Sequence, residues 1–402
     1  MIRRLTLVLL FVTVGQPATA QQIPLAVNDP VPTAQWRFGA VAMDPKAGLT
    51  NFGWDSNVFN EVEDPKEDFT FTITPAADLW MRTGRGLLTL NGAADLVYFH
   101  TYDSQRSVNS RATGQYEYGF NRFRPYFSAR TLSTSEPPGF EIEARVRHYE
   151  TEFQAGGEVR VGPKTNARLN FRQVAYTFAG DAIYNGRPLK EELNRTLRGS
   201  NFDWRQQLTA LTTWVVRVSL ENERFEFEQF RNSESFRLSS GFELGRFALI
   251  RGAAFVGYRK LSAANGGILP EFSGLIADVN VSYTAPYDTR LSVAVDREVE
   301  YSYESATPYY LLTSWTTAVT KRVTGRWDVQ LTGGRDYLDY RSVIAAVEAR
   351  TDTIGRFGGG IGYAVGDSMR LGFDVSSFYR RSDLPNREYG TIRGGLSVTY
   401  GY

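Results

Sequence analysis

The last segment of the chain, residues 389–402, constrains the fold most strongly. It reads YGTIRGGLSVTYGY, so that aromatic and aliphatic residues alternate with small or polar ones. A period of two is typical of a β-strand that meets water on one face only. A free last strand is an aggregation hazard, which a closed barrel removes by pairing this strand with the first. The segment therefore predicts an antiparallel, all-β transmembrane barrel. The apolar face would carry Ile392, Gly394, Leu396, Val398, Tyr400 and Tyr402.

Composition supports a barrel whose strands face lipid on one side and water on the other. Mean hydropathy is −0.32, yet aromatic residues make up 14% of the chain and glycine is abundant, at 37 residues. No segment approaches the length of apolar sequence that a membrane-spanning helix needs. Strands that are half apolar and half polar account for both observations.

The first residues predict export from the cytoplasm. Arg3 and Arg4 precede an apolar run over residues 5–12, and Ala18-Thr19-Ala20 then offers a small-x-small cleavage site. This order is typical of a secretory signal peptide, although a buried N-terminal helix is the alternative. We expect a signal peptide over 1–20, a periplasmic leader over 21–48 and the barrel over 49–402.

Short turns alternate with longer connections along the rest of the chain. Eight turns and nine loops predict about eighteen strands, with the first spanning strand over 49–58. Sixteen strands is the alternative, because the turn near 214–217 and the loop at 230–233 have weak signals. Short periplasmic turns and longer extracellular loops are the usual arrangement of a membrane barrel. We predict turns near 84–86, 119–122, 162–164, 214–217, 245–246, 285–288, 323–325 and 365–367.

The longest predicted connection covers residues 180–201. Its segment LKEELNRTL, residues 189–197, has the composition of about two helical turns. We expect this loop to form an external cap or a constriction folded into the lumen, and an ordinary solvated loop is the alternative.

Charged side chains concentrate on the faces opposite the apolar ones. In a dry core each unpaired charge would cost several kcal/mol, so this density indicates a hydrated lumen. The alternative is a narrow, closed barrel in which the charges pair with one another. The pore-lining candidates are His148, Glu150, Glu152, Glu158, Arg160, Arg168, Arg172, Arg290, Asp296, Glu298, Glu300, Arg370, Asp374 and Arg393.

Two arginines break the pattern. Arg297 and Arg335 fall on the predicted lipid-facing side, where a charge near the bilayer midplane costs about 2–4 kcal/mol. Either a bulge near Gly333-Gly334 shifts the register, or both arginines lie near the anionic headgroups.

The sequence offers little for catalysis. It has no cysteine and two histidines, and its net charge is +1. We find no phosphate-binding loop and no metal-ligand spacing, so we predict no enzyme activity, no cofactor, no metal site and no nucleic-acid partner.

Several stretches resemble a known family. Asp55-Ser56-Asn57-Val58-Phe59, an acidic loop and then FTFTITPAADL resemble the opening of the putative β-barrel porin 2 family of outer-membrane proteins. Later stretches, including YSYESATPYY at 301–310, are also similar. Members of that family are often encoded with exopolysaccharide biosynthesis and export genes, so the resemblance implies a role in moving a polysaccharide across the outer membrane.

These observations together predict an outer-membrane channel, specifically a conduit in exopolysaccharide export. A general diffusion porin for small polar solutes and a structural barrel with a charge-paired lumen are the alternatives. The expected partners are outer-membrane lipid and lipopolysaccharide, the barrel-assembly machinery through the C-terminal strand, the polysaccharide, and periplasmic export components.

Overall fold

The structure is a computed structural model that describes residues 30–402, except 246–247, 265, 268, 344–349 and 385–386. The predicted signal peptide and the first part of the leader lie outside the described residues, so the cleavage site stays a prediction.

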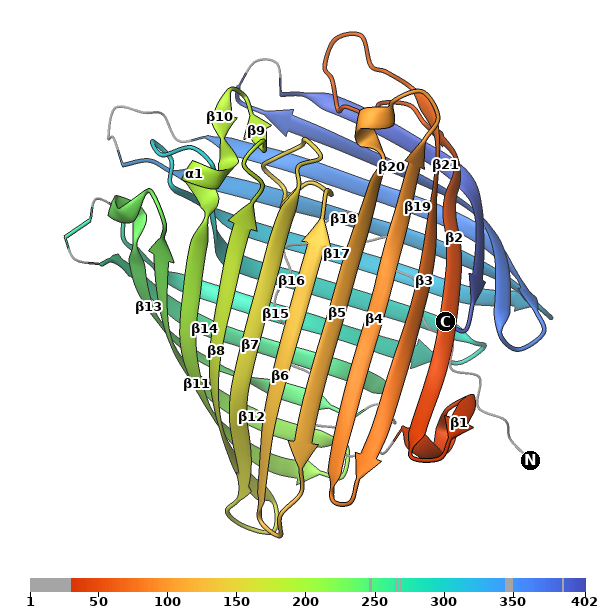
Figure 1. The fold of residues 1–402 in the computed structure, drawn as a ribbon, viewed down its shortest axis with the longest axis vertical. Coiled ribbons are helices and arrows are strands. Elements are labelled where there is room, and N and C mark those ends of the chain that lie inside the picture. Colours follow the sequence, from red (N-terminus) through yellow and green to blue (C-terminus); the bar gives the residue numbers. More distant parts are fainter. Residues whose placement is uncertain (1–29, 246–247, 265, 268, 344–349, 385–386) are drawn as a thin grey trace.

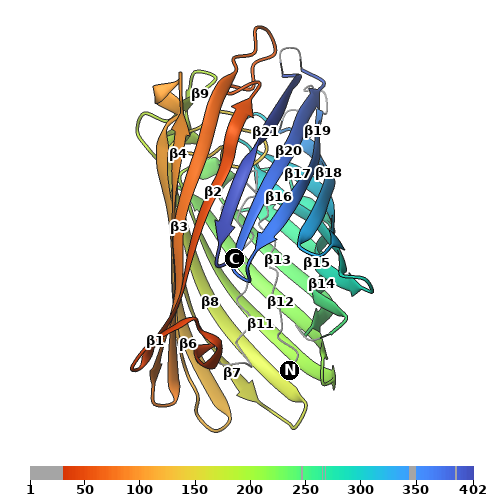
Figure 2. The same ribbon diagram turned by 90° about the vertical axis from the view of Figure 1, so that its right-hand side faces the viewer.

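Eighteen antiparallel strands follow one another in chain order around a closed barrel (Figures 1 and 2). Each pairs with its neighbours, and the last strand pairs with the first spanning strand. The predicted fold is confirmed, and the alternative of sixteen strands is wrong. The barrel strands are β2 (Val41–Asp55), β3 (Asp68–Thr83), β4 (Gly86–Phe99), β5 (Ser107–Tyr118), β6 (Phe123–Thr134), β7 (His148–Arg160), β8 (Thr165–Phe178), β11 (Arg195–Thr209), β12 (Thr212–Phe225), β13 (Ser233–Leu244), β14 (Ile250–Ala263), β15 (Phe272–Ala285), β16 (Thr289–Tyr301), β17 (Tyr309–Thr324), β18 (Trp327–Arg341), β19 (Thr351–Val365), β20 (Met369–Ser382) and β21 (Tyr389–Tyr400).

Alternation of side chains along each strand produces the two faces of the wall. In β20, Leu371, Phe373 and Val375 are each more than 40% exposed on the outer face. Arg370 and Asp374, between them in sequence, face the interior cavity. An outer surface that exposes large apolar side chains on strand after strand suits hydrocarbon rather than water as its solvent.

The connections are short at one end of the barrel and long at the other (Figure 1). One predicted turn is wrong, because residues 214–217 lie inside β12 and the reversal falls at Ala210-Leu211, where neither glycine nor proline marks it. The long β8–β11 connection holds the short strands β9 (Ile183–Tyr184) and β10 (Arg187–Pro188) and the single helical turn α1 (Leu189–Leu193). No helix among the described residues is long and apolar enough to cross a membrane.

The first spanning strand begins earlier than predicted. β2 starts at Val41 rather than at residue 49, so residues 41–48 belong to the wall and not to the leader. Pro45 pairs with Ala77 of β3, and β21 pairs with β2 only from Ala47 onward. Proline therefore lies where β2 has no partner on its β21 side, which is where a strand tolerates the missing N–H. The strand β1 (Trp36–Phe38) pairs with the start of β2.

The chain turns inward after β21. Gly401 has a φ of +76°, and Tyr402 beyond it lines the interior cavity, so its predicted place on the outer face is wrong. Ile392, Leu396 and Tyr400 do lie exposed on the outer face. The left-handed conformation at a glycine reverses the alternation for the final residue.

The seam between β2 and β21 closes through close backbone contact and one carboxylate. Gly53 pairs with Gly395, and a Cβ on Gly53 would lie 2.0 Å from the carbonyl oxygen of Gly394. Asp55, only 2% exposed, accepts hydrogen bonds from Arg393 Nε at 2.7 Å and Thr391 Oγ1 at 2.9 Å. The segment that resembles the family opening thus fastens the last strand to the first.

The two outward arginines do not mark a bulge. The registers β16–β17 and β18–β19 are unbroken, and β17–β18 shifts only near residues 322–324. Arg297 and Arg335 therefore lie on the outer face, and the bulge near Gly333-Gly334 is wrong.

Candidate functional site

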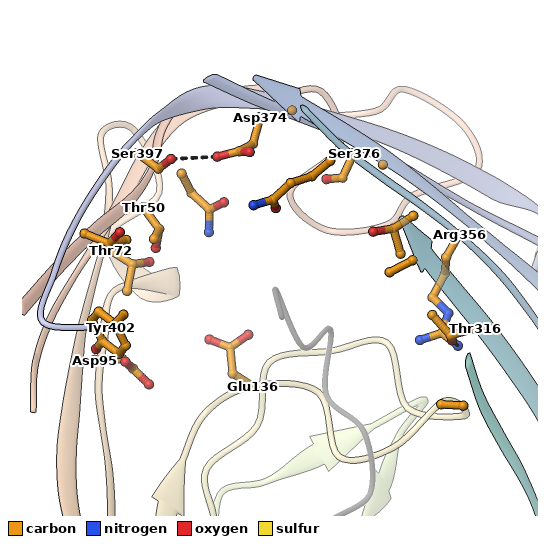
Figure 3. Close-up of a pocket in the computed structure, with 18 of the residues that line it drawn as sticks. Thr50, Thr72, Asp95, Glu136, Thr316, Arg356, Asp374, Ser376, Ser397 and Tyr402 are labelled. Carbon is orange, nitrogen blue, oxygen red and sulfur yellow. Dashed lines mark hydrogen bonds between the residues drawn. The ribbon is translucent and has the colours of Figure 1, made fainter. Parts of the chain in front are cut away.

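A cavity of 1240 Å³, lined by many polar and charged side chains, occupies the lumen. Its described lining comes from β2–β8, β11, β15–β21 and the segment 135–147 that joins β6 to β7. In Figure 3, Thr72, Asp95 and Tyr402 lie on one side of the cavity and Arg356 on the other. Asp288 and Asp367, in short turns, also line it, so the cavity reaches the periplasmic end of the barrel.

The structure brings eight of the fourteen sequence-predicted residues to this cavity. They are His148, Glu150, Glu152, Arg168, Arg290, Arg370, Asp374 and Arg393. Several also hold the wall together, because Arg370 contacts Asp328 at 2.7 Å and Arg393 fastens Asp55 in the seam. Asp374 accepts a hydrogen bond from Ser397 at 2.6 Å (Figure 3).

The other six lie outside the cavity lining, on inner faces where charges pair across the wall. Glu158 contacts Arg168 at 2.8 Å. Arg160, Asp296 and Glu300 share the inner faces of their strands with Glu158 and Glu298.

Arg172 begins a ladder of charge pairs whose side chains come from five strands. It contacts Glu221 at 2.5 Å, and Glu221 contacts Arg237 at 2.9 Å. Arg237 contacts Glu298 at 2.5 Å, and Glu298 also binds Arg259. On the inner faces of β8, β12, β13, β14 and β16, charged side chains therefore pair with one another, as the alternative of a charge-paired barrel predicts.

Segment 135–147 crosses the lumen beneath the long loops. Phe140 packs against an apolar cluster on the inner faces of β17–β19 that contains Tyr310, Leu312, Leu338, Tyr340 and Ile354. Glu136 points into the cavity from this segment (Figure 3) and is held by Arg145 at 2.7 Å. Burial of an aromatic ring on an apolar patch inside a polar lumen fixes the segment across the channel.

Arg380 of β20 fastens the middle of the segment. Its side chain is fully buried, and it donates a hydrogen bond to the carbonyl oxygen of Phe140 at 3.0 Å. It also binds the carboxylates of Glu143 and Asp352. This guanidinium group joins Glu143 of the segment to the fully buried Asp352 of the wall, so its removal is costly.

Glu141 fastens the segment to the β16–β17 loop. It accepts hydrogen bonds from Ser302 Oγ at 2.8 Å and from the backbone N–H of Tyr303 at 2.9 Å. Burial of this carboxyl raises its pKa from 4.5 to about 6, and the two hydrogen bonds oppose that rise.

The β8–β11 loop covers the segment from outside. Ile142 and Val146 of the segment pack with Leu189, Leu193 and Tyr303 in one buried cluster. Of the two roles predicted for this loop, an external cap or a constriction, its packing fits the cap. Residues 195–201 belong to β11 rather than to the loop. Segment 135–147, and not this loop, lines the cavity.

The family follows from a match over nearly the whole chain. Residues 31–402 match the family described as "Putative beta-barrel porin 2". The chain belongs to this family. No curated protein matches this chain. Its barrel is similar to that of Pseudomonas aeruginosa OccK2 (OpdF) in complex with glucuronate, at 11% identity and a TM-score of 0.50, over 89% of this chain and 97% of that one. It is also similar to a BenF-like porin from Pseudomonas fluorescens Pf-5, at 10% identity and a TM-score of 0.49, over 89% and 98%.

At such low identities these neighbours show the fold alone. Family and fold together identify an outer-membrane β-barrel of the porin type. In barrels of this kind the longer loops face the extracellular side. Within the described residues, no group of three or more carboxylate or imidazole side chains could hold a metal ion.

Sequence reasoning missed the residues that anchor segment 135–147 inside the barrel. Phe140, Glu141 and Glu143 lie in a stretch, PPGFEIE, whose two prolines and glycine indicated only a loop. One signal was available, because an isolated Phe and Ile among acidic residues in a long loop are unusual unless something buries them.

Proposed function

We propose that this protein is a gated outer-membrane channel for hydrated, polar molecules, and that its cargo is an extracellular polysaccharide in export. One observation carries the proposal of a gate. Segment 135–147 closes a polar lumen through side-chain contacts that can release, whereas the barrel wall is held by continuous backbone pairing. Displacing the segment would join the cavity to the extracellular side without breaking a strand.

The lining suits a hydrated polymer. Both signs of charge line the cavity, with Arg130 and Arg356 on one hand and Asp95 and Glu150 on the other. A mixed, wet lining binds neither cations nor anions strongly, so a long polar chain could pass without being trapped.

Polysaccharide as the cargo rests on the family resemblance and on a neighbour. OccK2 was solved in complex with glucuronate, an acidic sugar, so a barrel of this fold accommodates one. Periplasmic export components would deliver the polymer, and the barrel-assembly machinery would insert the protein through β21. Both partners are proposals.

Two other functions have an observation in their favour. A loop folded into the lumen also suits a general diffusion porin, which selects small solutes by size. The ladder of paired charges along β8 and β12–β14 suits a structural barrel with no cargo.

Single-channel conductance of the refolded protein in a planar bilayer separates these functions. Channel openings that an acidic oligosaccharide blocks, and that a neutral oligosaccharide of equal length blocks less, would support export. Openings that neither blocks, with uptake of small sugars in liposome-swelling assays, would support the diffusion porin. A silent bilayer from protein shown to be folded by heat-modifiable gel mobility would contradict a channel.

A further inference from the structure

Two lipid-facing arginines lack a carboxylate partner among the described residues. Arg297 of β16 donates hydrogen bonds to Thr313 Oγ1 at 2.6 Å and to the carbonyl oxygen of Leu275 at 3.3 Å, both of which are neutral. Arg335 of β18 lies over the Tyr337 ring, 5.1 Å from its centroid, and its Nε is buried without a hydrogen-bond partner. Each guanidinium group therefore keeps an uncompensated positive charge outside the barrel.

Arg297 also has a local structural role. β15 pairs with β16 only as far as Ala277, which faces Arg297, so the carbonyl oxygen of Leu275 has no partner in β16. The Nε of Arg297 donates a hydrogen bond to this carbonyl oxygen instead. This contact explains the position of the side chain but leaves its charge without a counter-ion.

Both arginines lie near the extracellular boundary of the membrane. Arg297 follows Tyr287, an exposed residue of a short periplasmic turn, by about ten residues, which climb about 25 Å in a tilted strand. That height matches the apolar band of an outer-membrane barrel. Two other outer faces also carry a charged side chain at a similar distance from the short turns. These side chains are Lys260 of β14 and Arg381 of β20.

The two arginines flank β17 and can act together. Arg297 faces Thr313 and Arg335 faces Trp315, and these two residues of β17 are neighbours on the same outer face. Two strand spacings of about 4.8 Å and a two-residue offset along β17 put the Cα atoms of Arg297 and Arg335 about 12 Å apart, so their long side chains can reach one ligand. Trp315 is 42% exposed and Leu275 is 65% exposed beside them, which offers an apolar surface to acyl chains.

We propose that Arg297 and Arg335 form a binding site for the phosphate groups of lipopolysaccharide in the outer leaflet. Guanidinium groups bind phosphate oxygens through charge-assisted, often bidentate hydrogen bonds. A phosphorylated glycolipid supplies the missing negative charge at this height and places its acyl chains against Trp315 and Leu275. The site would hold lipid against β16–β18, and Phe140 packs from inside against two of these strands, β17 and β18.

The test is a titration of the refolded, full mature chain in detergent with short-chain lipopolysaccharide, and with the same lipid after enzymatic removal of its phosphates. The variants are Arg335→Gln, the double variant Arg297→Gln/Arg335→Gln, and Lys321→Gln. Lys321 is an exposed, outward residue near the periplasmic end of β17, so it controls for a general effect of surface charge.

The wild-type protein and Lys321→Gln should bind the phosphorylated lipid at least about tenfold more tightly than the dephosphorylated one. The double variant should lose that preference. Equal affinity of the double variant and the wild type, or no preference for phosphate in the wild type, would overturn the proposal. A change in oligomeric state of the double variant without a change in lipid affinity would also overturn it, because the arginines would then lie at a contact between two copies.

Arg335→Gln keeps the test decisive if the double variant fails to fold. Arg335 donates no hydrogen bond to a described residue, so its replacement leaves the barrel intact, which heat-modifiable mobility would check. The single variant should bind the phosphorylated lipid at least about threefold more weakly, and unchanged binding would refute a role for Arg335.

Discussion

Removing the guanidinium group of Arg380 should open the channel. This side chain donates to the carbonyl oxygen of Phe140 and binds Glu143, so it joins segment 135–147 to the barrel wall. Asp352, its third partner, keeps Arg350 at 2.5 Å and would remain paired in the variant. Arg380→Gln therefore removes two charge-assisted contacts between segment and wall.

The size of the effect follows from those two contacts. Hydrogen bonds to a charged group contribute about 1.5–3 kcal/mol each, and Glu143 keeps its hydrogen bond from Tyr184 at 2.9 Å. The closed state should lose about 3–6 kcal/mol relative to the open one. A shift of 1.4 kcal/mol is tenfold in an equilibrium constant, so the open fraction should rise by about two to four powers of ten until it saturates.

Single-channel recording at pH 7.5 measures this effect directly. We expect the wild-type protein to open rarely and Arg380→Gln to be open for most of the record. Arg381→Gln is the matched control, because its neighbouring side chain lies on the opposite face of the same strand, near the Tyr379 ring. Equal open fractions in Arg380→Gln and the control would refute the argument that Arg380 holds the gate.

Three further predictions follow from single residues. The pKa of Glu141, raised from 4.5 to about 6 in the closed state, means that the segment is held most strongly below pH 4.5 and loses about 2 kcal/mol as pH rises through 6. Channel recordings should therefore show an open fraction that increases from pH 4.5 to 7, and Glu141→Gln should remove this pH dependence. Asp55→Asn should weaken the seam by about 1–3 kcal/mol and lower the temperature at which the barrel unfolds on a heat-modifiable gel, whereas an unchanged temperature would exclude a role for Asp55 in closure. Gly53→Ala should prevent closure in most molecules, because its Cβ would lie 2.0 Å from a backbone oxygen of β21, and a normal yield of folded barrel would show that the seam can shift.

The strands could be predicted from sequence because their signal is local. Alternation in residues such as Leu371, Phe373 and Val375 repeats every second position, and each repeat is visible without knowledge of any partner strand. Closure of the barrel on its last strand followed from the same alternation. The start of β2 was harder to predict. Pro45 argues against a strand in general, but it lies on a stretch of β2 that has no β21 partner.

The gate could not be predicted because its contacts are remote in sequence. Glu141 meets Ser302 across 161 positions, and Arg380 meets Phe140 across 240. No periodicity connects such residues, so the sequence indicated a loop and a charged inner face separately. The longest loop is conspicuous in the sequence because of its length, whereas the segment that crosses the lumen is shorter and is fixed by its partners.

The most direct test of the account compares the conductance of the wild-type protein with that of a variant in which residues 137–143 are replaced by a short Gly-Ser linker. Both should migrate as folded, heat-modifiable barrels. We expect small, infrequent openings for the wild type and a large, steady, ohmic conductance for the variant. Equal conductance in the two proteins would contradict the claim that segment 135–147 closes the channel.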